Sequence, residues 1–209
     1  RLLAPLLLRA LDATGAFSRP PPLPAAAAGE AAQAVALKTV ADRVQLDNLR
    51  LVSHQDTFNV RRPAPGAPAR VFMRASLVEG DVDFVFGHAT LVIDDSTLLS
   101  RAGRRGTGHV LAPSTTAAEL LGFLVQRSRF VAEPGMAPGS VSLGRAWDEG
   151  VPPGQWLAGM SPNGQALVRD SVMGRHIGPW AASTSRRPFA GGRDFADPDG
   201  HLWAALWMD

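Results

Sequence analysis

Three carboxylates alternate with apolar or small residues in the segment VEGDVDFVFGHA, residues 78–89. In an extended strand, side chains two residues apart share a face, so Glu79, Asp81 and Asp83 are predicted to lie together. A carboxylate held among apolar neighbours is one whose pKa can be tuned for chemistry. A solvated acidic edge, or a turn aspartate that caps nearby N–H groups, is the alternative interpretation of this segment.

Four polar residues interrupt apolar runs at a spacing that a repeating structure would superimpose. Gln33 and Gln55 are 22 residues apart, and Asp56 and Asp83 are 27 residues apart. In a solenoid of stacked strands, successive coils lie about 4.8 Å apart. Two amides and two carboxylates would then stack on one face. A ladder of purely structural polar side chains is the other explanation of the set.

Such a set could hydrolyse an ester without serine, histidine or metal. Two carboxylates in contact cannot both ionise easily, so one pKa rises and the other falls. The ionised group can act as nucleophile or base and the protonated one as acid, while amide N–H groups can stabilise an oxyanion. Arg145, in the interrupted apolar run Leu-Gly-Arg-Ala-Trp, is the candidate cation that keeps the nucleophile ionised.

The elements that would position these residues recur as short apolar runs with a polar turn in the middle. The runs cover residues 44–51, 71–78, 92–99, 123–131 and 166–173. With Asn48, Ser76, Ser96, Ser128 and Ser171 as markers, the steps between runs are 28, 20, 32 and 43 residues. These irregular repeats predict an all-β protein, a right-handed single-stranded parallel β-helix. A β-sandwich would show closer strands and clearer hairpin signals.

The chain divides into two regions by composition. Residues 1–30 contain a helix-like apolar segment, Leu2–Leu11, followed by a Pro- and Ala-rich linker. The apolar stretch that ends at Arg9 could be a remnant of a signal peptide. Residues 31–209 are the predicted β-helix with a C-terminal tail, in which Trp203 and Trp207 have helical spacing and are expected to be packing residues.

Composition excludes several classes of function. The 209 residues carry a net charge of +2 and no cysteine, which excludes disulfides, cysteine-ligated zinc and a thiol nucleophile. The basic residues are scattered and nucleic-acid-binding signatures are missing, so no nucleic-acid partner is expected. No apolar run is long enough to span a membrane. The five histidines show no metal-ligand spacing, and His54 and His88 are taken as neighbours of the site without a role.

Four motifs in order resemble the pectin methylesterases, or pectinesterases. They are Gln-Ala-Val-Ala-Leu from residue 33, Gln-Asp-Thr-Phe from 55, Gly-Asp-Val-Asp-Phe-Val-Phe-Gly from 80 and Leu-Gly-Arg-Ala-Trp from 143. The last motif and the segment Arg-Pro-Phe-Ala-Gly from 187 resemble a bacterial branch labelled pectinesterase B or acyl-CoA thioester hydrolase. The resemblance covers about residue 31 to the C-terminus and implies the pectin lyase-like β-helix that the repeats predict.

The resemblance also implies roles for individual residues. Asp83 would attack the ester carbonyl, and Asp56 would protonate the departing methanol. Gln33 and Gln55 would stabilise the oxyanion, and Arg145 would pair with Asp83. Trp147 and Phe86 would line the sugar-binding groove. The family implies no cofactor or metal, methylated pectin as the polysaccharide substrate, and a secreted, periplasmic or outer-membrane-associated location. The partner is expected to be this polysaccharide or another ester substrate, and the protein is expected to be a monomer.

The sequence departs from the family in several places. Only about thirty residues precede the Gln33 motif, so the family's first coils and capping helix are expected to be missing here. Most members have proline at the position of Ala146 and an aromatic residue at the position of Asn59. The chain has no tyrosine, which removes usual sugar-stacking positions.

Three other functions remain open from the sequence. One is hydrolysis of an acyl-CoA thioester or another ester by the same site. Another is a non-catalytic, polysaccharide-binding β-helix fragment. The third is a calcium site made by Glu79, Asp81 and Asp83, which would make stability sensitive to chelators.

Overall fold

The computed structural model describes residues 7–9, 33–102 and 106–189, and in these residues every regular element is a β-strand. Sheet I contains β1 (Leu7–Arg9), β3 (Val44–Asp47), β6 (Arg70–Arg74), β9 (Thr90–Asp94), β12 (Phe123–Gln126) and β15 (Ala166–Arg169). Sheet II contains β4 (Arg50–Val52), β7 (Leu77–Gly80), β10 (Thr97–Ser100), β13 (Arg129–Ala132) and β16 (Val172–Met173). Sheet III contains β2 (Leu37–Val40), β5 (Phe58–Arg61), β8 (Val82–Gly87), β11 (Gly108–Pro113), β14 (Val141–Gly144) and β17 (Ile177–Gly178).

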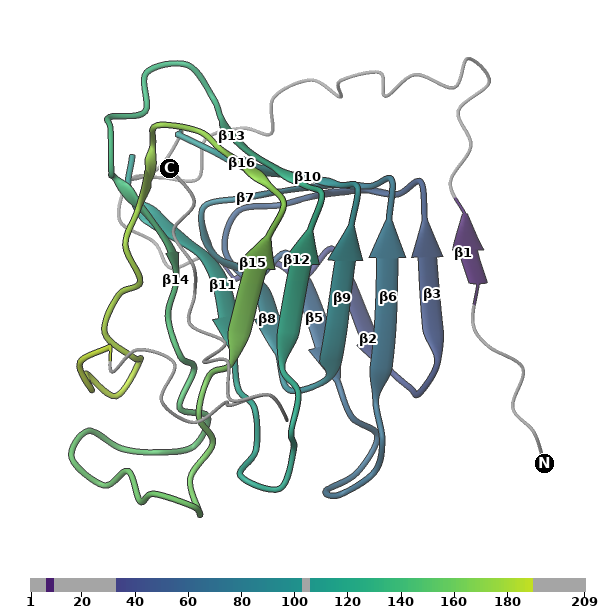
Figure 1. The fold of residues 1–209 in the computed structure, drawn as a ribbon, viewed down its shortest axis with the longest axis vertical. Helices are drawn as coiled ribbons and strands as arrows, with labels where there is room; N and C mark the ends of the chain where they lie inside the picture. Colours follow the sequence, from purple (N-terminus) through teal and green to yellow (C-terminus); the bar gives the residue numbers. More distant parts are fainter. Residues whose placement is uncertain (1–6, 10–32, 103–105, 190–209) are drawn as a thin grey trace.

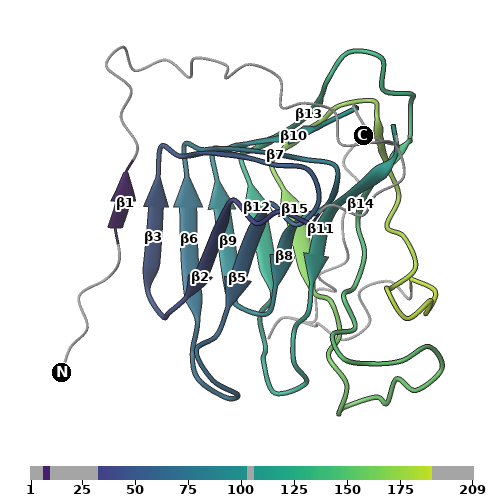
Figure 2. The same cartoon turned by 180° about the vertical axis from the view of Figure 1, so that it is seen from behind.

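All pairings between these strands are parallel. From β2 to β14, each strand pairs with the strand three elements later in the chain, whereas β1 pairs with β3. One coil therefore contributes one strand to each of the three sheets. Figures 1 and 2 show this stack from its two sides, with sheet I as a row from β1 to β15. The predicted parallel β-helix is confirmed, and the five predicted apolar runs are the successive strand pairs of sheets I and II.

The core is a set of side-chain columns that run along the solenoid. Leu46, Met73, Ile93, Val125 and Val168 stand in register on neighbouring strands of sheet I, and each is at most 3% exposed. Alternation in a strand sends every second side chain inward, so each coil contributes one residue to each column. A coil buries its apolar face only against its neighbours, and this makes stacking the source of stability.

A column of serines fills the corner between sheets I and II. Each serine hydroxyl donates to the carbonyl two residues earlier in its own coil and accepts from the N–H of the preceding coil; the members are Ser76, Ser96, Ser128 and Ser171. The prediction of Asn48 as the first marker is wrong by one residue. Leu49 is the partner of Ser76, so the first step is 27 residues. Asn48 has a φ of 53° and matches Ala75, which has a φ of 47°.

Two expectations concern the ends of the chain. The helix-like segment predicted for Leu2–Leu11 is wrong where the structure describes it, because Leu7–Arg9 is the strand β1, paired in parallel with β3. The rest of the segment, the linker, and Trp203 and Trp207 lie outside the described residues. Within the described part of the chain, no helix is long and apolar enough to cross a membrane.

Candidate active site

Asp56 and Asp83 occupy matching positions on adjacent coils. Phe58 of β5 pairs with Val85 of β8, and the same offset of 27 residues places Asp56 on Asp83. The Asp56 N–H donates to the carbonyl of Val82 at 3.1 Å, which fastens the two corners together. Both aspartates have left-handed backbone conformations, with φ of 64° and 48°. Aspartate tolerates this region better than most residues, and such strain is common at functional sites.

Arg145 forms a two-pronged ion pair with Asp83. Its Nε lies 3.0 Å from Oδ1 and its Nη2 lies 2.6 Å from Oδ2. The Asp83 side chain is 12% exposed and the Arg145 side chain 25%. A bidentate guanidinium fixes both oxygens of a carboxylate and favours its ionised form. The expected pairing of these two residues is present in the structure.

The Asp56 carboxyl has a pKa raised from 3.8 to about 6. Burial is the largest cause, and the negative charge of Asp83 adds to it, while Arg145 and a hydrogen bond from Gln55 act in the opposite direction. The Asp56 carboxyl group therefore stays protonated in mildly acidic solution, up to a pH of about 6. A carboxylic acid beside a carboxylate paired with arginine has the asymmetry needed for acid and nucleophile roles.

Gln33 and Gln55 pair in parallel on the coils that precede Asp83. The N–H of Ala34 donates to the carbonyl of Gln55 at 3.2 Å, so the two glutamines stack one coil apart as predicted. Gln55 is half-buried and adjacent to Asp56, whereas Gln33 is exposed. The four predicted polar residues thus lie on three successive coils at the entrance to sheet III.

The three carboxylates of residues 79–83 do not lie on one face, and that prediction is wrong. Strand β7 ends at Gly80 and β8 begins at Val82, so a corner at Asp81 breaks the alternation. Each carboxylate has its own basic partner: Arg50 contacts Glu79 at 2.6 Å, His54 contacts Asp81 at 3.2 Å, and Arg145 contacts Asp83. Among the described residues, no three acidic or histidine side chains are grouped to hold a metal ion.

Trp147 and Phe86 lie together beside the aspartates. Their ring centroids are 5.6 Å apart at an interplanar angle of 58°. Phe86 is 7% exposed, so it supports Trp147 more than it offers a surface of its own. The guanidinium of Arg61 lies 5.8 Å from the Trp147 ring centroid and contacts Glu149 at 2.7 Å. Arg61 and Glu149 are contacts that the sequence analysis did not predict.

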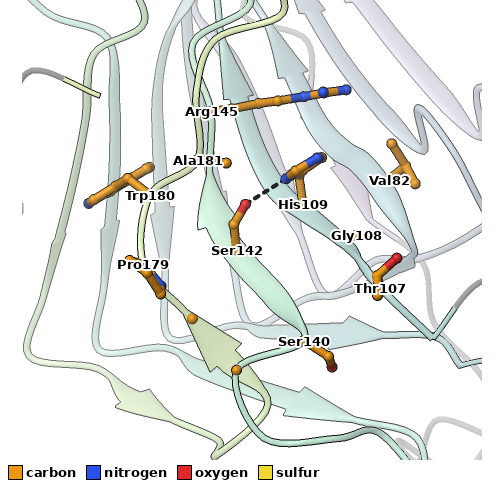
Figure 3. A pocket seen from close by; sticks show the side chains of 12 residues that line it. Val82, Thr107, Gly108, His109, Ser140, Ser142, Arg145, Pro179, Trp180 and Ala181 are labelled. Atoms are coloured by element: carbon orange, nitrogen blue, oxygen red, sulfur yellow. Dashed lines mark hydrogen bonds between the residues drawn. The ribbon is translucent and has the colours of Figure 1, made fainter. Parts of the chain in front are cut away.

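Arg145 also lines a pocket of about 440 Å³ (Figure 3). His109 and Ser142 lie in it, with the imidazole Nδ1 2.6 Å from the hydroxyl Oγ. Sequence reasoning missed both residues. The signal was available for His109, because it follows Val82 by 27 residues and pairs with it, the same step that relates Asp56 to Asp83.

The fold and the site define a parallel β-helix with two stacked aspartates, one of them paired with arginine. A family model described as Pectinesterase matches residues 16–150. Pectinesterase B of Dickeya dadantii is 40% identical over 173 residues, which are 76% of this chain and 40% of that protein. The pectinesterase of Ralstonia solanacearum is 39% identical over 163 residues, which are 75% of this chain and 41% of that protein.

A solved structure supports the same assignment. The rice weevil pectin methyl esterase superposes with a TM-score of 0.70 at 31% identity, covering 84% of this chain and 50% of that one. The chain belongs to the pectinesterase family. It spans 40 to 41% of the length of the two bacterial pectinesterases that it matches.

Proposed function

We propose that the protein is a carboxylic ester hydrolase that removes methyl esters from polygalacturonate, with Asp83 as nucleophile and Asp56 as acid and base. The observation that carries this proposal is the asymmetry of the stacked pair. Asp83 is held by both prongs of Arg145, and Asp56 has a pKa of about 6. Two neighbouring carboxyl groups with different environments are suited to different steps of one reaction.

In the first half of the reaction, an oxygen of Asp83 attacks the carbonyl carbon of the methyl ester. The oxyanion that forms accepts hydrogen bonds from the side-chain amides of Gln33 and Gln55. The bond between the carbonyl carbon and the methoxy oxygen then breaks, and Asp56 gives its proton to that oxygen. Methanol leaves, the substrate acyl group remains on Asp83 as an anhydride, and Asp56 is left ionised.

In the second half, water attacks the substrate carbonyl carbon and transfers a proton to Asp56. The bond to Asp83 breaks and releases the free galacturonate carboxyl group. Both aspartates return to their starting protonation states. The net reaction consumes one ester and one water and yields one carboxylic acid and one methanol. Arg145 keeps the Asp83 oxygens aligned through both halves.

The substrate assignment rests on family membership together with the aromatic pair beside the site. The names of the relatives, pectinesterase B of Dickeya dadantii and the rice weevil pectin methyl esterase, describe activity on pectin. Trp147, supported by Phe86, provides an aromatic surface of the kind on which sugar rings pack. Because pectin is a plant cell-wall polymer, we infer a role in cell-wall modification and pectin catabolism by a secreted or periplasmic protein.

Methanol release from highly methylated pectin tests the proposal, with the wild-type chain and Asp83→Asn measured side by side. Release by the wild type alone is expected, because the amide keeps the volume of the side chain but cannot act as nucleophile. Equal release by both proteins would refute the mechanism. No release from either, with a β-rich circular dichroism spectrum, would refute the function, and acyl-CoA hydrolysis is then the next assay.

A further inference from the structure

A buried ion pair, which the proposed mechanism does not use, joins the last two sequence motifs. Asp148 directly follows the motif that ends at Trp147, and Arg187 begins the segment Arg-Pro-Phe-Ala-Gly. The guanidinium of Arg187 contacts both oxygens of the Asp148 carboxylate, Nη2 to Oδ1 at 2.6 Å and Nε to Oδ2 at 3.0 Å. The Asp148 side chain is 0% exposed and the Arg187 side chain 22%. Two stretches 39 residues apart in the sequence are therefore held together at a buried point.

The covering segment (residues 181–187) supplies the other partners of Asp148. The Ser185 hydroxyl donates to Oδ2 at 2.5 Å, and the backbone N–H of Asp148 donates to the Thr184 hydroxyl at 3.0 Å. Burial alone would raise the pKa of Asp148, but hydrogen bonds from Arg187 and from serine hydroxyls of the covering segment lower it below its ordinary value. The carboxylate is therefore ionised at neutral pH.

The same guanidinium contacts the long connection between β14 and β15. It lies 4.0 Å from the centroid of the Trp156 ring, a cation–π contact, and its Nη2 donates to Asn163 Oδ1 at 3.2 Å. The Asn163 N–H donates to the Thr115 carbonyl at 2.7 Å, which fastens this connection to the residues after β11. Arg187 thus joins the covering segment to Asp148 and to the connection that follows it.

The ion pair lies at the end of the stretch that carries Arg145 and Trp147. Residues 144–148 continue β14 as an extended segment. On one side, the N–H groups of Arg145 and Trp147 donate to carbonyls of β11 at 2.9 and 2.8 Å. On the other side, the N–H groups of Ala181 and Thr184 donate to the carbonyls just before Arg145 and Trp147, at 2.9 and 3.0 Å. The covering segment therefore holds this stretch against β11, and the ion pair fixes its far end.

The bidentate contact of Arg145 with Asp83 depends on where this backbone lies. The Arg145 side chain crosses one coil to reach Asp83, so both of its prongs fit the carboxylate only while residues 144–148 keep their place. A displacement of about 1 Å at a reacting group can lower a rate about 100-fold. A buried ion pair is weak evidence for stability, because apolar side chains would fill the same space without the cost of desolvation. Directed hydrogen bonds instead select one position of the segment.

We propose that Asp148 and Arg187 are positioning residues for ester hydrolysis, which hold residues 144–148 so that both prongs of Arg145 meet Asp83. The inference rests on the proposed function, because it concerns the same nucleophile. The two residues act through Arg145, and the bond-breaking steps belong to the aspartates.

A double-mutant cycle of methanol release tests the inference. In the wild-type background, Arg187→Gln is expected to lower kcat about tenfold and to raise KM less than about threefold. In an Arg145→Gln background, the same substitution should lower kcat less than about twofold, because the group through which it acts is already gone. A merely structural role predicts the same loss in both backgrounds.

Arg187→Lys carries the same tests if Arg187→Gln fails to fold. Lysine keeps a cation beside the buried carboxylate but lacks the fork, so a loss of about threefold in kcat is expected, and none in the Arg145→Gln background. Ser96→Ala is the control for a general loss of stability, since it removes a buried hydroxyl from the corner of sheets I and II. Its kcat should equal that of the wild type.

Hydrogen exchange of the Arg145 and Trp147 amides tests the positioning without turnover. Both N–H groups are bonded to carbonyls of β11, so their exchange reports how firmly the stretch is held. In Arg187→Gln we expect exchange at least about tenfold faster at both amides and unchanged exchange in β9 of sheet I.

The two measurements separate the inference from the proposed function. If the wild type releases methanol while Arg187→Gln keeps its kcat, or loses equally in both backgrounds, the inference alone is wrong. Unchanged exchange at the two amides also overturns it. If the wild type releases no methanol but exchange rises as expected, the proposed hydrolysis is wrong and the positioning of Arg145 by the ion pair stands.

Discussion

Arg145 reaches Asp83 across an intervening coil of the β-helix. The Arg145 backbone N–H bonds to the carbonyl of Leu111 on that coil, while its guanidinium contacts both oxygens of Asp83 on the coil beyond. Ala112, which follows Leu111, pairs with Phe86 on the coil that carries Asp83. The ion pair therefore couples three coils and makes the nucleophile's orientation dependent on their stacking.

Replacing Arg145 should lower kcat more than it raises KM. Arg145→Gln is expected to lower kcat at least about 100-fold, the scale seen when one group that stabilises a reacting charge is removed. Arg145→Lys should recover part of the loss, since it restores charge without the bidentate geometry. Methanol release is the measurement. Arg127→Gln is the control, because it removes a similar 2.6 Å ion pair, with Asp94, from sheet I; an equal loss there would contradict a specific role for Arg145.

Activity should fall as the pH rises above about 6. Asp56 must carry a proton to release methanol, and its pKa is about 6. The value of kcat/KM is therefore expected to drop about tenfold per pH unit on the alkaline side. In Arg145→Gln this limb should move to higher pH, because the arginine is one of the groups that lower the Asp56 pKa. An alkaline limb that stays in place in that variant would argue against Asp56 as the acid.

The raised pKa of Asp56 also predicts that stability declines as the pH rises from about 4 to about 6. In this window the folded protein holds a proton that the unfolded chain has released, so raising the pH favours unfolding. The Asp56→Asn variant has no such titration and should be more stable than wild type above pH 6. A two-unit pKa change corresponds to about 2.7 kcal/mol, which solvent screening reduces to about 1 to 2 kcal/mol. Urea unfolding at pH 4 and pH 7 would measure it, and a variant less stable at pH 7 would contradict the sign.

The stacking of Asp56 on Asp83 was predictable because the chain repeats at the step that brings them together. Spacing alone also placed Gln33 near Gln55, and the serine markers defined the corner of sheets I and II. Each of these depends on local alternation and on coil length, which are visible in the sequence. Spacing offered Arg145 only as a candidate cation, because it is 62 residues and two coils away from Asp83. The pairing of the two residues came from the family resemblance.

Other features depend on geometry that alternation does not encode. The corner at Asp81 separates Glu79 from Asp83. The sequence could not show this corner, because residue types alternate in the same way in a bent segment as in a straight strand. His109 lies one coil from Val82, but it follows a glycine-rich stretch that reads as a loop. Arg61 and Glu149 are far apart in sequence and meet only because their coils end beside Trp147.

Glu149→Gln should weaken substrate binding through Trp147. The Glu149 carboxylate contacts Arg61 at 2.7 Å and holds its guanidinium 5.8 Å from the centroid of the Trp147 ring. Its removal is therefore expected to free the guanidinium and loosen the aromatic surface. We expect KM for methylated pectin to rise about threefold with little change in kcat, the effect of losing about 0.7 kcal/mol of uniform binding. Glu119→Gln is the control, because Glu119 forms a similar 2.6 Å pair with Arg62. Equal effects of the two variants would exclude a specific contribution from Trp147.

Ser96→Ala should destabilise the solenoid from its middle. The Ser96 hydroxyl accepts from the Ser76 N–H at 3.1 Å and donates to the Asp94 carbonyl at 2.8 Å, and the residue is 4% exposed. Alanine would leave a buried N–H and a buried carbonyl with one partner fewer, at a cost of about 1 to 3 kcal/mol. Ser171→Ala removes the last hydroxyl of the same column, where the bond to the Arg169 carbonyl is exposed, and should cost less. Urea unfolding of the two variants would measure the difference, and an equal loss in both would show that burial along the column does not determine its contribution.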